Sequence, residues 1–138
     1  MTRAALGLPP ARVATEPFGV LMETGYDRGT ATVVAFGDGS ASLYLSTGGG
    51  FIGGASRPAL RTAAQTLVTE AARFQPQATR TTTFPLPQPG ETRFYLLSDA
   101  GVFTASAAEQ ELGEQRHPWA PLFYAGQAIV GNVPEFLV

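Results

Sequence analysis

"TATVVAFGDGSASLYLS", residues 30–46, is the stretch of sequence that decides the fold. Two runs rich in β-branched and other apolar residues flank Asp38 and Gly39, the dipeptide best suited to the positive φ angles of a tight hairpin turn. A similar run, "FGVLMET" at 18–24, precedes them and is separated from them by "GYDRG" at 25–29. The sequence therefore predicts three antiparallel strands that pair in chain order.

The residues after this sheet predict two helices and a second hairpin. From Arg57 to Phe74, apolar residues recur at the spacing of one helix face. The run at 79–87, "TRTTTFPLP", predicts an extended edge segment, because proline cannot donate to a central strand. "TRFYLLSDAGVFTASA" at 92–107 predicts a second hairpin, and Pro121 to Val133 predicts a closing helix.

This order of elements favours one α+β domain over residues 17–138. Strands that are grouped, rather than alternating with helices, are typical of an antiparallel sheet with helices packed on it. We expect five to six strands, in the order β-β-β-α-β-β-(β)-α, with two main helices on one face. Residues 1–16 carry two adjacent prolines and no periodic pattern, so we expect a poorly structured N-terminal arm.

Composition and charge narrow the classes of partner. The chain has 138 residues and a net charge of -2. Hydrophobic residues make up 44% of it and charged residues only 14%, a composition that predicts a globular domain. No basic cluster is present, so we expect no nucleic-acid partner. No apolar run approaches the length of a membrane span, and the N-terminus lacks the pattern of a signal peptide, which favours a cytoplasmic protein without a membrane partner.

Few residues offer catalytic or metal chemistry. The chain has no cysteine and a single histidine, His117, so we predict no metal and no cofactor. Acidic residues precede this histidine at Glu109, Glu111 and Glu114, a grouping that a solvated loop explains as well as a catalytic site does. We assign no catalytic residue, and we interpret His117 as a residue that caps or packs at the start of the last helix.

One glycine-rich stretch could hold an anion. In "LYLSTGGGFIGGASRP", residues 43–58, an apolar strand is followed by glycines and then by the start of a helix, the local order of a phosphate-binding turn. The candidate ligand-binding residues are Gly48, Gly49, Gly50, Gly53, Ser56 and Arg57. The other interpretation is structural, because glycines also allow a chain to reverse sharply from a strand into a helix.

The structural interpretation of these glycines is the better supported one. A dinucleotide-binding turn needs a parallel strand after the helix and an acidic residue about 20 residues further on. The next extended stretch, "TRTTTF" at 79–84, has neither aspartate nor glutamate, and the chain contains no lysine for a P-loop.

Counting the faces of the expected sheet predicts a homodimer. Two helices cover about one face of a five- or six-stranded sheet, since packed helices lie roughly 8 to 10 Å apart and strands under about 5 Å. We expect Tyr44, Tyr95 and Phe103 to add aromatic surface to the bare face. An exposed apolar patch of that kind usually marks a partner surface, and twofold self-pairing is the commonest way to cover it.

Two segments, "GSASLYLSTGGGFIGG" at 39–54 and "ELGEQRHPWAPLFYAGQAIV" at 111–130, resemble a set of small uncharacterised bacterial proteins of this length. That resemblance implies no activity. In the order of its elements the chain is also similar to the profilin-like roadblock and longin domains, and to small acidic secretion chaperones. Both groups bind partner proteins, so the likeness implies an interaction role.

Two functions follow as hypotheses. The first is a non-enzymatic interaction module that dimerises and binds a protein partner. The alternative is a small-ligand or anion-binding domain that uses the glycine-rich loop at 48–54 and the start of the following helix.

Overall fold

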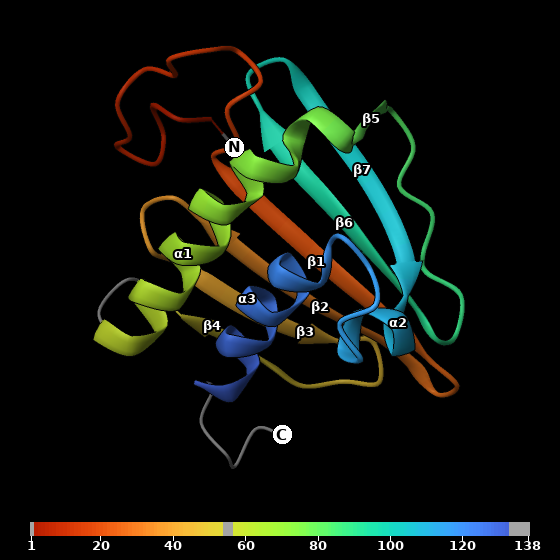
Figure 1. The fold of residues 1–138 in the computed structure, drawn as a ribbon. Helices are drawn as coiled ribbons and strands as arrows, with labels where there is room; N and C mark the ends of the chain where they lie inside the picture. Colours follow the sequence, from red (N-terminus) through yellow and green to blue (C-terminus); the bar gives the residue numbers. More distant parts are fainter. Residues whose placement is uncertain (1, 54–56, 133–138) are drawn as a thin grey trace.

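A computed structural model describes residues 2–53 and 57–132 and contains one seven-stranded antiparallel sheet (Figure 1). The order of strands across the sheet is β4-β3-β2-β1-β6-β7-β5. In chain order the elements are β1 (Gly19–Tyr26), β2 (Gly29–Phe36), β3 (Ala41–Leu45), β4 (Gly50–Gly53), α1 (Pro58–Phe74), the 3-10 turn η1 (Gln75–Gln77), β5 (Thr79–Thr81), β6 (Glu91–Ser98), β7 (Gly101–Ala108), α2 (Glu109–Gly113) and α3 (Ala120–Gly131).

The α+β class, the antiparallel sheet and the two main helices on one face are confirmed. Figure 1 shows α1 and α3 side by side on the same face of the sheet, with the short α2 near its lower end. Pro58 occupies the first turn of α1, where its missing N–H costs no hydrogen bond. The hairpin turns are also as expected, since Gly39 has a φ of 92° and Gly101 a φ of 120°.

The sheet has more strands than the five to six expected. The additional strand is β4, which pairs with β3 within a stretch that the sequence pattern presents as a loop. The segment "TRTTTF" contributes only the three-residue edge strand β5, which pairs with β7.

The core lies between the sheet and the helices. Alternate residues of the strands face α1 and α3, because side chains of a strand point to opposite sides in turn. Val20, Met22, Phe94 and Leu96 are at most 2% exposed. The ring of Trp119, at the start of α3, packs between those of Phe74 and Phe94, with centroid distances of 5.1 and 5.3 Å. Burial of each large side chain contributes roughly 1.5–3 kcal/mol.

A proline-rich segment, residues 82–90, covers part of the opposite face of the sheet; we call it the strap. Tyr95 points to this face, and its ring meets the Phe84 ring edge-on with 5.6 Å between centroids. The strap also lies against β1, because the Gly90 N–H donates to the Gly25 oxygen at 2.8 Å. A Cβ atom at Gly25 would lie 2.3 Å from the Gln88 oxygen, so only glycine allows this approach.

Residues 2–16 form turns, with no helix or strand, and they are tied to the rest of the fold. The guanidinium of Arg3 donates to the main-chain oxygen of Glu16 at 2.6 Å and lies 3.7 Å from the carboxylate of Asp99. The Ala100 N–H donates to the Ala14 oxygen. The arm therefore packs against the β6–β7 turn.

Candidate functional site

The three consecutive glycines form the turn of a hairpin. Gly48 and Gly49 have φ angles of 111° and 84° and connect β3 to β4, which then runs back along β3. The Gly48 N–H donates to the oxygen of Leu45, the last residue of β3. The expectation of a reversal from a strand directly into a helix is therefore corrected: the chain reverses from strand to strand.

The structure does not bring the glycine triplet together with the start of α1. Residues 50–53 form the extended strand β4, which rises about 3.3 Å per residue. This strand separates the glycine turn from the start of α1. Gly53 lies at the α1 end of this strand, and the guanidinium of Arg57 lies 5.5 Å from the centre of the Phe51 ring. Gly54 and Ser56 lie outside the described residues.

The three aromatic residues expected at an interface lie in different environments. Tyr44 is 46% exposed on the face opposite the helices. Tyr95 points to the same face but is only 2% exposed, because the strap covers it. Phe103 pairs with Leu96 and packs against the core on the helix side, so the expectation that it adds surface to the bare face is wrong. A role of these residues in an interface stays a prediction.

The uncovered part of the open face lies over β2, β3 and β4. Ile52 on β4 is 78% exposed, the largest exposed fraction among the large hydrophobic side chains of the described residues. Ile52 pairs with Ser42 of β3, and Tyr44 lies two residues beyond Ser42 on that strand. Thr32 and Glu23 share this face and are joined by a hydrogen bond of 2.9 Å, so the face mixes polar and apolar groups.

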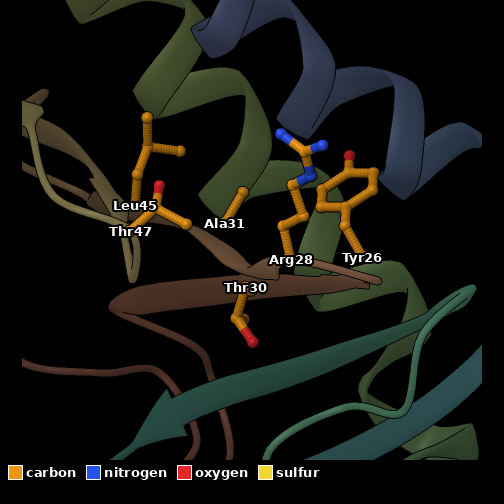
Figure 2. A pocket seen from close by; sticks show the side chains of 7 residues that line it. Tyr26, Arg28, Thr30, Ala31, Leu45 and Thr47 are labelled. Atoms are coloured by element: carbon orange, nitrogen blue, oxygen red, sulfur yellow. The ribbon is translucent and has the colours of Figure 1, made fainter.

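A second feature is an apolar cleft between α3 and the ends of β1, β2 and β3. It consists of two cavities of about 170 and 210 Å³ that share Tyr26, Ala31 and Leu45. Figure 2 shows these side chains and Arg28 rising from the sheet towards the helices, whereas Thr30 points to the other side. The sequence pattern had not singled out this cleft.

At the rim of the cleft, the Tyr26 hydroxyl donates to a carboxylate oxygen of Glu109 at 3.2 Å. Partial burial raises the pKa of the Tyr26 phenol, and the negative charge of Glu109 raises this pKa further. Tyr26 therefore stays protonated at neutral pH and keeps its hydrogen bond to α2.

His117 and the nearby glutamates do not form a catalytic arrangement. The Nδ1 atom of His117 accepts a hydrogen bond from the Trp119 N–H at 3.0 Å, so its side chain bonds to the main chain just before α3. Glu114 is exposed, and hydrogen bonds from Gln110 and Arg116 lower the pKa of its carboxyl group. Within residues 2–53 and 57–132, no three acidic or histidine side chains cluster closely enough to hold a metal ion.

None of the helices in the described part of the chain is both long and apolar enough to cross a membrane. Comparison of the chain with protein-family models, with curated proteins and with solved structures finds no match.

Proposed function

We propose that this chain is a non-enzymatic interaction module that pairs with a second copy of itself through β4 and the adjoining open face. The observation that carries the proposal is Ile52, which is 78% exposed on a strand that has one strand neighbour among the described residues. The outer N–H and C=O groups of β4 pair with no strand of the described chain, and an unpaired edge readily accepts another strand.

The two edges of the sheet differ in a way that supports this choice. The opposite edge, β5, has three residues, includes the charged Arg80 and leads directly into the strap. Charges and prolines at an edge oppose strand addition. β4 has the sequence Gly-Phe-Ile-Gly and no charged residue. In a twofold pairing of β4 with its copy, the Ile52 side chains face each other and Tyr44 extends the apolar contact.

The anion-binding alternative has less support, because the glycine triplet and the start of α1 lie at opposite ends of β4. A thermal-shift screen with nucleotides, phosphate and sulfate tests that alternative directly, since a ligand that binds the native state raises the melting temperature.

Light scattering behind size exclusion tests the dimer. We expect the wild-type chain to have the mass of two chains at micromolar concentration, and Ile52→Asp to have the mass of one. Val13→Asp is the matched control, because Val13 is also a strongly exposed apolar residue, at 61%, but lies in the N-terminal arm. A wild-type mass of one chain that persists as the concentration rises contradicts the proposal.

A further inference from the structure

The cleft between α3 and the sheet has the features of a ligand site that is separate from the β4 edge. Its deeper cavity is lined by Met22, Val33, Leu43 and Val130, with Thr24 as a polar group among them. Ligand sites are typically apolar hollows with a few placed polar groups. The lining of this cleft matches that description.

Val130 of α3 and Ala31 of β2 line the deeper cavity on its helix side and its sheet side. The methyl group of Ala31 leaves space there that a larger side chain would fill. One turn before Val130, at Gly126, α3 lies so close to the sheet that a Cβ atom would be 2.6 Å from the sulfur of Met22. The helix therefore contacts the sheet at Gly126, and the hollow lies beside Val130 and Ala31.

Thr24 and Gln127 add polar side chains to the lining of the deeper cavity. The Thr24 hydroxyl lies 2.9 Å from the hydroxyl of the fully buried Thr92, and the two share one hydrogen bond. When Thr24 is the acceptor of that bond, its own hydrogen can be donated to an oxygen of a ligand. Arg28 lines the outer cavity, points from the sheet towards the helices (Figure 2) and makes no ion pair with any described residue.

The charge at the cleft selects the class of ligand. Among the described residues that line the two cavities, Arg28 is the only charged one and none is acidic. The carboxylate of Glu109 accepts a hydrogen bond from Tyr26 near the rim, and Glu109 is not among these lining residues. A guanidinium beside an apolar hollow binds a carboxylate through charge-assisted hydrogen bonds while the hollow takes up the hydrocarbon part.

We propose that this cleft binds a small monocarboxylate with an apolar chain or ring, its hydrocarbon part between α3 and Ala31 and its carboxylate at Arg28. Water, with one non-hydrogen atom, takes about 30 Å³ in the liquid. The two cavities, of about 170 and 210 Å³, therefore have room for roughly ten non-hydrogen atoms.

Octanoate, octan-1-ol and octylammonium, which share one chain length and differ in charge, are the probes. Titrations are followed by NMR shifts of the Ala31 methyl and the Val130 methyls in the full chain. We expect octanoate to shift these signals and to bind about tenfold more tightly than octanol. Arg28→Gln should weaken octanoate about tenfold and leave octanol unchanged. Arg12→Gln, at an exposed arginine in the N-terminal arm, is the matched control and should change neither.

Ala31→Leu, which fills the cleft, should abolish binding while the chain still melts cooperatively; if that variant does not fold, Val130→Phe fills the same space from α3. The proposal is overturned if millimolar octanoate leaves the cleft signals unmoved, or if the filled variants bind it as the wild type does. It is equally overturned if octanol or octylammonium binds as tightly as octanoate, or if Arg12→Gln weakens octanoate as much as Arg28→Gln.

Discussion

The hydroxyl of Tyr95 donates a hydrogen bond to the main-chain oxygen of Pro85, with 3.0 Å between the two oxygen atoms. This bond joins the middle of β6 to the strap and accounts for the 2% exposure of a tyrosine on the face that no helix covers. The prolines that keep residues 82–90 out of the sheet thus leave this segment available to cover it.

Tyr95→Phe should destabilise the protein by about 1 kcal/mol, because the Pro85 oxygen loses its partner while the ring still packs. Urea unfolding measures the loss, and amide hydrogen exchange over 84–90 should become faster. Tyr44→Phe is the control, since Tyr44 is 46% exposed, and should change the free energy of unfolding by less than about 0.5 kcal/mol. Equal effects of the two substitutions would show that the hydrogen bond does not hold the strap.

Alanine at two glycines of α3 should have different effects. At Gly131 nothing lies within 4 Å of a new Cβ atom, so Gly131→Ala should stabilise the helix by up to about 1 kcal/mol. At Gly126 the new atom would lie 2.6 Å from the sulfur and the terminal methyl group of Met22, so this side chain must shift towards the cavity that it lines. The displacement of Met22 offsets the better helix propensity of alanine, so Gly126→Ala should stabilise the chain less than Gly131→Ala does. Thermal unfolding measures both changes, and equal stabilisation by the two variants would contradict the close contact.

The glycine turn provides a similar pair. Gly49 has a φ of 84° with open space around it, so Gly49→Ala should cost about 1 kcal/mol from backbone strain alone. Gly50 has a φ of 149°, and a Cβ atom there would lie 2.3 Å from the Leu43 oxygen. Gly50→Ala should therefore cost more, about 2 kcal/mol or above, since it adds a clash with the partner strand to the strain. Urea unfolding of both variants decides, and equal losses would rule out the clash.

Replacement of His117 tests its capping role. His117→Ala removes the acceptor for the Trp119 N–H and should cost about 0.5–1.5 kcal/mol. Near-UV circular dichroism of Trp119, the only tryptophan, should report a looser start of α3. His117→Asn retains a side-chain acceptor and should recover part of the loss. If alanine and asparagine behave alike, the hydrogen bond contributes nothing measurable.

The predictable parts of the fold are those whose signals are local. The Asp38-Gly39 turn specifies its hairpin within a few residues, and the helical spacing from Leu60 to Phe74 needs no knowledge of the sheet. β4 was missed because its four residues begin and end with glycine, which is rare in strands.

The features that escaped the sequence pattern depend on register and packing. Phe103 faces the helices because it pairs with Leu96, and that register is set by the whole hairpin. The cleft depends on how closely α3 approaches Met22, which follows from packing between residues far apart in the chain.

The central position of β1 has a consequence for how the chain folds. Leu21 pairs with Val34, close by in sequence, on one side, and with Tyr95, far along the chain, on the other. Pairing of β1 with β2 closes a short loop. Pairing of β1 with β6 closes a much longer one, so more conformational entropy is lost before contacts between these strands form. We expect the first three strands to form early and the docking of β6 onto β1 to limit the rate of folding. Stopped-flow refolding of Leu96→Ala, a truncation in β6, should then slow folding more than it speeds unfolding, while the reverse result would place that docking after the rate-limiting barrier.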